Sequence, residues 1–296
     1  MDLSGKIDLH MHTTVSDGTD TPEEIVARVR DAGIGLFSVT DHDAVKAGRI
    51  ILPLLAEGDP VFLTGVEFSC RDKEGKYHIL GYGYDPDAAP IRGLVENGHR
   101  LRIRKLKARL DFLRSAFGFS FSQEAQEELF CLDNPGKPHL ANLMVRQGYA
   151  GTKEDAIKNY INKLRFGGVY FRPEEAIGGI LAGGGIPVLA HPSYGSGDER
   201  IVGEEMDRRL KKLMALGLQG VEAYYAGFDE ELRKEMLSFA ERYGLYVTAG
   251  SDYHGKNKKV PLGDTGLGGP DEWPDGLRRF LADVRKQRGQ EQQAAE

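Results

Sequence analysis

Short apolar runs alternate with helix-type patterns along most of the chain. Seven of these runs have the length and the β-branched or aromatic content of strands: residues 7–12, 36–42, 61–70, 77–84, 187–191, 221–226 and 246–254. Helix-type segments lie between them, and one begins at Thr21, where Pro22 and Glu24 complete a capping-box pattern. Pro173 and Asp229 mark two further helix starts. The alternation predicts an α/β fold whose mostly parallel sheet is closed, or nearly closed, into a barrel of about seven strands.

The segment 87–170 interrupts this alternation. It contains no run of strand character and has the pattern of several helices, so we expect a helical insertion between the fourth and fifth strands. The expected organisation is a barrel formed by residues 1–86 and 171–286, with residues 87–170 as an inserted lid or substrate subdomain. The polar, alanine-rich residues 287–296 are expected to form a flexible tail.

Composition narrows the class of protein and its location. The 296 residues include 39 Lys+Arg and 45 Asp+Glu, a net charge of −6, which argues against extended nucleic-acid binding. The two cysteines form no CxxC pair, which excludes a disulfide framework and a cysteine-ligated zinc site. We see no signal peptide and no apolar run long enough to span a membrane. These features predict a cytoplasmic protein without a membrane partner.

Residues of metal-ligand type stand at or near the ends of the predicted strands. Residues two apart in a strand point to the same side, so pairs of this spacing face one site. The carboxyl ends of barrel strands converge on one face, which predicts a shared metal site there. Glu222 is the acidic residue of the sixth strand, which carries no histidine. The candidate ligands are His10, His12, Asp17, His42, Glu67, His78, His191, Asp252 and His254.

The ligand types indicate the metal. Imidazole and carboxylate without thiolate suit manganese, iron or zinc. Nine candidates exceed the four to six ligands that a single ion takes, so we expect two or three divalent ions. Glu67, which is central in strand order, is the expected bridging carboxylate. Several ions close together are typical of hydrolysis at phosphorus or at a carbonyl.

The motifs that carry these residues resemble a known family. They read DLHMHTTVSDGTDTPEEIV, SVTDHD, GVEFSC, YHILGY, VLAHPS and GSDYHG. Together they are similar to the PHP (polymerase and histidinol phosphatase) family over about residues 6–263. The insertion resembles that of small stand-alone PHP phosphoesterases, which act on nucleoside 3′,5′-bisphosphates, short RNA 5′ ends or cyclic sugar phosphates. The resemblance implies a distorted (β/α)7 barrel and a phosphatase or phosphodiesterase.

The resemblance also implies a division of the ligands into three groups and a mechanism. The mechanism would be attack of a metal-activated hydroxide at phosphorus, with Asp252, His191 and Glu67 as catalytic residues. The implied groups are His10, His12, Glu67 and Asp252 for one ion, then Glu67, His78 and His191, then Asp17, His42 and His254.

Basic residues of the insertion are candidates for substrate binding. Residues 92–114 hold eight Lys/Arg and two Asp/Glu. On a helix, Ile103, Leu106, Leu110 and Leu113 form an apolar stripe, and Arg100 and Arg104 share a neighbouring face. This face is either simply solvated or part of a lid whose arginines bind a second phosphate. Lys137 and His139 lie in a Gly-Lys-Pro-His turn, where we expect a phosphate contact and a substrate contact or general acid.

Two alternatives to a phosphoesterase follow from the same residues. A metal-dependent amidohydrolase would keep the ions and cleave an amide, but the central strands offer Glu67 where such enzymes usually carry a bridging lysine. A non-catalytic accessory PHP module would be expected to lack ligands, and this chain has all nine. The expected partner is therefore a small phosphorylated metabolite, a nucleotide or a short RNA 5′ end, and the oligomeric state is open.

Overall fold

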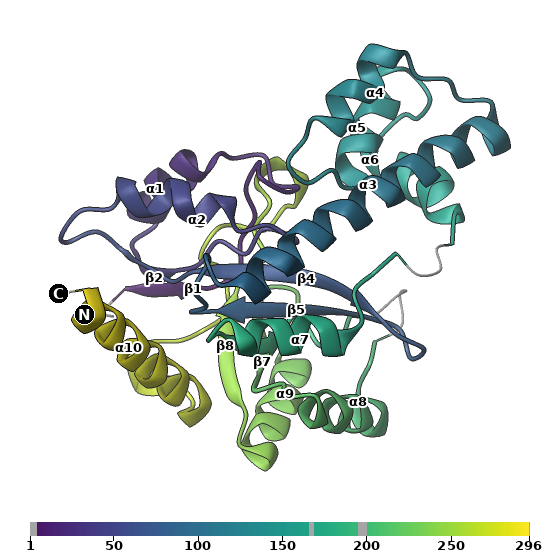
Figure 1. Cartoon of the computed structure of the whole chain (residues 1–296). Helices are drawn as coiled ribbons and strands as arrows, with labels where there is room; N and C mark the ends of the chain where they lie inside the picture. Colours follow the sequence, from purple (N-terminus) through teal and green to yellow (C-terminus); the bar gives the residue numbers. More distant parts are fainter. Residues whose placement is uncertain (1–4, 166–168, 195–199, 296) are drawn as a thin grey trace.

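The computed structural model describes residues 5–165, 169–194 and 200–295, with side chains described up to residue 286 (Figure 1). Its strands form two sheets, one with the order β1-β2-β3 and one with the order β4-β5-β6-β7-β8. Helices cover the outer faces of both sheets. The strands are β1 (Lys6–Asp8), β2 (Ile34–Phe37), β3 (Val61–Phe62), β4 (Gly65–Arg71), β5 (Lys76–Tyr82), β6 (Ile186–Leu189), β7 (Gly220–Tyr225) and β8 (Tyr246–Gly250).

The sheets contain both parallel and antiparallel strand pairs. The pairs β1–β2, β2–β3, β6–β7 and β7–β8 are parallel, as the sequence predicts for strands joined through helices. The pairs β4–β5 and β5–β6 are antiparallel. A tight turn joins β4 to β5: the carboxylate of Asp72 accepts from the backbone N–H of Glu74 at 2.8 Å, and Asp72 N–H donates to the Gly75 carbonyl at 3.0 Å. A connection this short permits only an antiparallel pair.

Isolated bridges join the two sheets. Met11 pairs with Tyr253, and His42 pairs with Glu67, both in parallel orientation. The predicted third strand, 61–70, is two strands, because the chain leaves β2 after β3 and pairs with β5 from Gly65 onward. The fold is therefore mixed α/β, as expected. The expected distorted (β/α)7 barrel is not confirmed, since the described strands form two sheets that such bridges connect.

Helix starts follow the predicted capping signals. Thr21 accepts a hydrogen bond from the backbone of Glu24, whose side chain accepts in return from Thr21 N–H at 2.7 Å. Asp229 likewise accepts from Leu232 N–H at 2.9 Å. These contacts confirm the predicted N-termini. The helices packed around the sheets are α1 (Pro22–Asp31), α2 (Lys46–Ile51), α7 (Pro173–Ala182), α8 (Gly203–Ala215), α9 (Glu230–Tyr243) and α10 (Asp275–Ala295), with a 3-10 turn, η1 (Leu52–Leu54), after α2.

Between β5 and β6 the described residues form helices joined by loops, and outside an isolated bridge of Phe171 with Cys70 they contain no strand, as the sequence predicts. The long helix α3 leads away from the sheets to a lobe that closes on its own apolar cluster, which includes Leu106, Leu110 and Leu113 of the predicted stripe (Figure 1). Whether this lobe is a separate domain stays a prediction. Its elements are α3 (Ala89–Phe117), α4 (Gln123–Phe130), α5 (Lys137–Arg146), α6 (Lys153–Asp155), the π-helical η2 (Ala156–Tyr160) and the 3-10 turn η3 (Ile161–Lys163).

The C-terminal helix α10 packs on β8 through buried Leu277 and Phe280. The segment 287–296, predicted as a flexible tail, is helical to Ala295, and its side chains lie outside the described residues. In the described part of the chain, every helix is too short or too polar to cross a membrane.

We expect Gly250→Ala to destabilise the protein. A Cβ at Gly250 would lie 2.2 Å from the His10 Cβ and 2.4 Å from Glu222 Oε1. The first atom adjoins the backbone, and the second is held by its hydrogen bond with His10 Nδ1. Overpacking of this kind costs ~1–3 kcal/mol, so thermal denaturation should show a melting temperature several degrees lower. The control is Gly178→Ala on the exposed face of α7, where a Cβ meets open space. That variant should be neutral or more stable, and equal melting temperatures would contradict the prediction.

Candidate metal centre

The nine candidate ligands lie together around the ends of the strands. His10 and His12 follow β1, His42 follows β2, and His191 follows β6. Glu67 lies within β4, where it is 1% exposed. The remaining members are His78 in β5, Asp17 in the loop after β1, and Asp252 and His254 after β8. The structure thus brings together residues from segments as distant as 10 and 254 in the sequence.

Glu67 is the hub of the cluster. Its Oε2 lies 3.2 Å from His12 Nε2 and 3.0 Å from His42 Nδ1. Its Oε1 lies 2.8 Å from His78 Nδ1 and 3.2 Å from His191 Nε2. The two oxygens therefore face different sets of imidazoles. This is the arrangement that a carboxylate bridging two ions requires.

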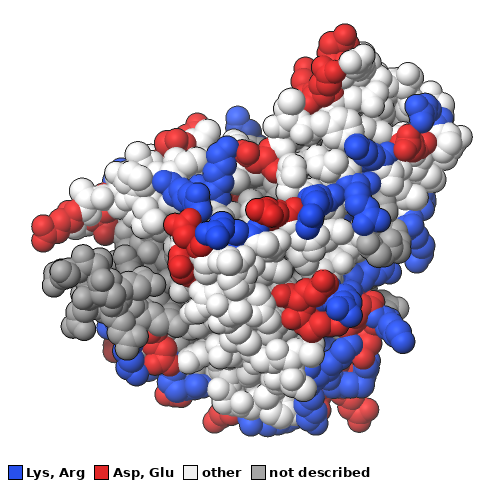
Figure 2. Space-filling model, viewed as in Figure 1, with Lys and Arg blue, Asp and Glu red and all other residues white. Residues whose placement is uncertain are grey.

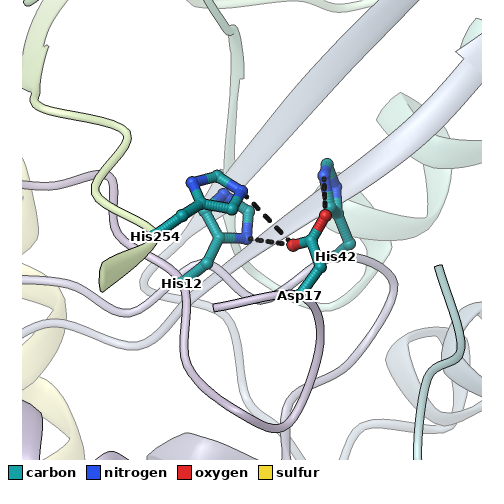
Figure 3. A group of neighbouring side chains, drawn as sticks. All are labelled: His12, Asp17, His42 and His254. Carbon is teal, nitrogen blue, oxygen red and sulfur yellow. Dashed lines mark ion pairs between the residues drawn. The ribbon is translucent and has the colours of Figure 1, made fainter. Parts of the chain in front are cut away.

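Asp17 is the centre of a second group (Figure 3). Its Oδ1 lies 3.3 Å from His254 Nε2 and 3.7 Å from His12 Nδ1, while its Oδ2 lies 3.9 Å from His42 Nε2. Figure 3 shows the three imidazoles turned toward this carboxylate. His12, which the family resemblance places with Glu67, is thus also close to the Asp17 group.

The two oxygens of Asp252 have different surroundings. Oδ1 lies 3.5 Å from His10 Nε2 and 3.4 Å from His12 Nε2, on the side of the ligand cluster. Oδ2 accepts from the Tyr225 hydroxyl at 3.2 Å and from the Lys258 ammonium. One oxygen is therefore available to an ion, and the other is held by residues outside the cluster.

Electrostatics favours ionised carboxylates in the cluster. Burial alone would raise the pKa of Glu67, but the surrounding histidines, His42 first among them, hold that pKa well below its usual range. Histidine neighbours do the same for Asp17. Burial lowers the pKa of His42 to about 3, so its imidazole is neutral and able to ligate. Carboxylates that are charged and an imidazole that is neutral are the forms that bind a cation.

Two ligand candidates adopt unusual backbone conformations. His191 has φ of 28° and Asp252 has φ of 56°, in the left-handed region that non-glycine residues rarely occupy. Such conformations are typical of functional sites, because the surrounding contacts impose the strain. Asp43, which follows His42, shares this feature with φ of 54°.

The residues present fit divalent metal ions. The candidate ligands include three groups of neighbouring residues. Within each group, the ligand atoms lie within 4.8 Å of one another and belong to imidazoles and carboxylates. Nδ1 of His191 is buried without a hydrogen-bond partner among the described residues. A buried imidazole nitrogen of this kind costs free energy unless a proton donor or an ion occupies the space before it. The groups are His12, Asp17, His42 and His254; His10, His12 and Glu67; and His42, Glu67 and His78.

Glu222 supports the cluster from β7 and was not predicted as a site residue. It is fully buried, and its Oε1 accepts from His10 Nδ1 at 2.8 Å while its Oε2 accepts from the backbone N–H of His191 at 2.7 Å. A carboxylate behind a ligating histidine fixes its tautomer and orientation. The sequence signal was present: Glu222 is a single charge within an otherwise apolar strand.

A further buried carboxylate shapes the loop that carries Asp17. Asp41 accepts from Thr13 N–H at 2.8 Å, from the Thr13 hydroxyl at 2.7 Å and from the Ser16 hydroxyl at 2.6 Å. Three bonds to one carboxylate hold the loop in a single conformation. The neighbouring residue, Asp17, is thereby fixed beside the histidines.

The insertion approaches the centre through the start of α5. Gly136 lies against Asp17, with 3.7 Å between the position of a Cβ at Gly136 and the Asp17 Cβ. Nδ1 of His139 accepts from the backbone N–H of Gly136 at 2.9 Å, and burial lowers the pKa of His139. Lys137 donates to Asn162 Oδ1 at 2.6 Å. Lys137 and His139 therefore lie in the first turn of α5 rather than in a separate turn. His139 is near Asp17, and Lys137 is near Lys76, Arg109 and Asn162.

The predicted basic face of α3, which carries Arg100 and Arg104, lies on the exposed side of the helix. Arg100 and Arg104 are exposed, and Arg100 lines a groove of about 630 Å³ between α2 and α3 that also contains Glu96 and Asp133. Figure 2 shows Lys and Arg side chains gathered along α3 with Asp and Glu beside them. Other cations of α3 turn inward: buried Arg102, for example, forms a 2.6 Å ion pair with Asp43. The apolar stripe sets which side of α3 faces the rest of the protein. Arg102 is on the buried side, and Arg100 and Arg104 are on the exposed side.

Fold and site together define a class of protein. It is an α/β protein with a buried histidine and carboxylate centre able to hold divalent ions. The model of the PHP domain family matches residues 8–171. The chain therefore belongs to the PHP domain family, and it is a metal-dependent phosphoesterase, a hydrolase of phosphoric esters.

Curated relatives have different substrates. The chain is 31% identical over 258 residues to the 3′,5′-nucleoside bisphosphate phosphatase of Chromobacterium violaceum, covering 84% of this chain and 87% of that protein. It is 31% identical over 269 residues to the phosphoribosyl 1,2-cyclic phosphate 1,2-diphosphodiesterase of Eggerthella lenta, covering 86% and 96%. A 5′-3′ exoribonuclease of Haemophilus influenzae is 27% identical, covering 85% and 91%.

One solved structure agrees with this assignment, and a second shares the fold. A Bifidobacterium adolescentis protein described as a candidate metal-dependent phosphoesterase aligns with a TM-score of 0.78 and 29% identity, covering 93% of this chain and 95% of that chain. A Chromobacterium violaceum protein described as an amidohydrolase aligns with a TM-score of 0.79 over 95% of this chain and 96% of that chain. At 24% identity, this second likeness bears on the fold alone.

Proposed function

We propose that the chain hydrolyses a small phosphorylated substrate at a centre of two or three divalent ions, with manganese, iron or zinc as the candidates. The observation that carries the proposal is the position of Glu67, whose Oε1 and Oε2 face different imidazoles. Substrates of this class are nucleoside 3′,5′-bisphosphates, nucleotides, and sugar phosphates or cyclic phosphates. The three relatives differ in substrate but share a phosphate ester as the bond that is broken.

The nine candidates are assigned as ligands in overlapping groups. Bound ions supply Lewis acidity at the phosphoryl group and lower the pKa of a water molecule. We assign His10, His12, Glu67 and Asp252 to one ion, Glu67, His78 and His191 to a second, and Asp17, His42 and His254 to a third, with His12 near this last group. Asp252, His191 and Glu67 are the ligands proposed to lie nearest the reacting phosphoryl group.

Other residues of the chain prepare this site for catalysis. Glu222 holds His10 with Nε2 facing the cluster, and Tyr225 and Lys258 hold the outer oxygen of Asp252. His139 is placed to contact the substrate, because it stands in the first turn of α5 beside Asp17. Burial lowers its pKa and favours the neutral imidazole, which suits a substrate contact better than the alternative role of general acid. Residues 87–170 are proposed to form a substrate-binding lobe.

Removal of bound metal should abolish activity reversibly. Purified protein should contain at least two first-row metal ions per chain. A chelator should eliminate hydrolysis of an aryl phosphate, because the proposed reaction depends on bound ions for Lewis acidity and for activation of water. Activity should return with manganese, iron or zinc, and phosphate release across bisphosphates, cyclic phosphates and short RNA would then identify the substrate. Full activity of a preparation shown to be metal-free by elemental analysis would refute the proposal.

A further inference from the structure

One group of candidate ligands stands on loops rather than within strands. Asp17, His42 and His254 follow β1, β2 and β8, and Figure 3 shows their side chains together. An ion tolerates deviations of only about 0.2 Å in the distances to its ligand atoms. Contacts that hold these three loops in place therefore decide how well an ion binds at this group.

Asn257 holds two of these ligands through their backbone. It is the last residue of the 3-10 turn η4 (Gly255–Asn257). Its Nδ2 donates to the Asp17 carbonyl at 2.7 Å, and its backbone N–H donates to the His254 carbonyl at 3.2 Å. The ligand atoms of the same two residues, Asp17 Oδ1 and His254 Nε2, lie 3.3 Å apart. Asn257 thus helps to set the separation of two ligands.

Lys153 of the insertion fixes the orientation of the Asn257 amide. Lys153 begins α6, and its ammonium donates to Asn257 Oδ1 at 2.9 Å and to the Asn257 carbonyl at 3.1 Å. Because an ammonium only donates, the amide turns its oxygen to Lys153 and its NH2 group to the Asp17 carbonyl. The insertion thus reaches Asp17 through one intermediate side chain.

Asn134 is a second contact from the insertion to the same group. It lies between α4 and α5, is 1% exposed, and donates through Nδ2 to the His42 carbonyl. The preceding residue, Asp133, is anchored on two sides: its carbonyl accepts from His99 Nδ1 at 2.9 Å, and its carboxylate pairs with Lys46 at 2.6 Å. Contacts with α3 and α2 therefore set where Asn134 meets His42.

Other ligands of the centre are supported from the sheets. Glu222 of β7 accepts from His10 Nδ1 at 2.8 Å and from His191 N–H at 2.7 Å. Glu67 and His78 lie within the antiparallel ladder of β4 and β5. These contacts do not involve the insertion. Weaker docking of the insertion should therefore disturb the loop-borne group and leave the strand-borne ligands in place.

We propose that docking of the insertion completes the ion site of Asp17, His42 and His254, with Asn134 and Asn257 as positioning residues. The inference rests on the proposed function, because it concerns one of the ions of that centre. Removal of a contact that orients a metal ligand typically lowers metal affinity 10–100-fold. The effect is expected at this one ion and not at the others.

The coupling acts in both directions. If docking of the insertion raises the affinity for an ion by some factor, the bound ion favours docking by the same factor. The docked insertion also places His139 beside Asp17, where we propose a substrate contact. The chain thus assembles this ion site and its substrate-binding lobe together.

The test is a calorimetric titration of chelator-treated protein with manganese, in which Asp17→Asn identifies the binding event that belongs to this group. Asn257→Ala should weaken that event by about 10-fold or more and leave the other events unchanged. Lys153→Met should weaken it by about 3-fold or more, the effect of one net hydrogen bond. Lys153→Arg, which can donate to both Asn257 oxygens, should restore it. Lys158→Met, at an exposed lysine of the same insertion, is the control and should match the unmodified protein.

Hydrogen exchange measures the reciprocal effect. Manganese should slow amide exchange in residues 131–140 and 151–160 of the unmodified protein, and it should do so less in Asp17→Asn and in Asn257→Ala. Exchange that manganese leaves unchanged in the unmodified protein would show that the ion and the insertion are not coupled, and the inference would fail.

Metal binding separates this inference from the proposed function. If manganese binds with the stated dependence on Asn257 and Lys153 but no phosphate ester is hydrolysed, the proposed function fails and the inference stands. If an aryl phosphate is hydrolysed but Asn257→Ala and Lys153→Met bind manganese as the unmodified protein does, the inference fails and the proposed function stands. Equal weakening of every ion in these variants, or no effect of Asp17→Asn on any binding event, would also overturn the inference.

Discussion

Glu67→Gln should remove nearly all phosphoesterase activity and at least one bound ion. The variant keeps the shape of the side chain but replaces one oxygen by an amide nitrogen, which donates and cannot ligate. In the present arrangement, Oε2 faces His12 and His42 while Oε1 faces His78 and His191. Either orientation of the amide therefore removes a ligand from one of the two groups. We expect kcat/KM for an aryl phosphate to fall more than ~100-fold.

The variant should remain folded. Burial of an ionised Glu67 is costly, as the opposing contributions to its pKa show, so a neutral side chain of equal volume does not disrupt the core. Circular dichroism and thermal denaturation check this, and elemental analysis counts the ions. The matched control is Glu127→Gln on α4, which is exposed and far along the chain from every candidate ligand. An active Glu67→Gln enzyme with full metal content would exclude Glu67 as the bridge.

The candidate site was predictable from the sequence to the extent that it depends on strand ends. His10 and His12 are two residues apart, so an extended chain turns both imidazoles to one side wherever the strand formally stops. β1 ends at Asp8, and both residues still face the cluster. Glu67 was identifiable because a lone acid in the middle of a buried strand needs a compensating partner. The gathering of the candidate ligands was thus predictable despite errors of several residues in the strand bounds.

Other features depend on contacts distant in sequence and could not be predicted. The division of residues 61–70 into β3 and β4 follows from pairing with β2 on one side and with β5 on the other. Helix periodicity identified the stripe of Leu106 and Leu110 but did not show that Arg102, next to that stripe, pairs with Asp43. Which cations of α3 are buried is decided by contacts that are distant in sequence, such as those with α7 and with Asp43.

A pocket lined by Arg71, Lys76, Arg109 and Lys137 could not be predicted from the sequence either. Lys76 and Arg71 have no unusual sequence context, and the chain as a whole is acidic. Only the antiparallel pairing of β4 and β5 sets Arg71 opposite Lys76, and only the insertion adds Arg109 and Lys137 to them. The sequence showed a local excess of positive charge on α3. It did not show which of these cations line the pocket, because that depends on the fold.

Glu222→Ala should weaken metal binding although Glu222 is not itself a candidate ligand. The change leaves His10 Nδ1 and the His191 N–H without their acceptors, so both ligands lose the contacts that orient them. Loss of such a supporting carboxylate typically costs 10–100-fold in metal affinity or activity. Titration of chelator-treated protein with zinc or manganese measures the affinity, and kcat/KM for an aryl phosphate should fall in parallel.

The control for this substitution lies on the neighbouring strand. Thr248 is paired with Glu222 in the β7–β8 ladder and is equally buried, but its hydroxyl forms no hydrogen bond to a candidate ligand among the described residues. Thr248→Val removes a buried polar atom at constant volume and should leave metal affinity unchanged. Glu222→Gln separates the effect of charge from that of packing. If its amide oxygen accepts from His10, its amide nitrogen must face the His191 N–H, so two donors meet. The metal affinity of this variant should therefore lie between those of the alanine variant and the unmodified protein. Metal affinity equal to that of the unmodified protein in Glu222→Ala would show that packing alone holds His10 and His191 in place.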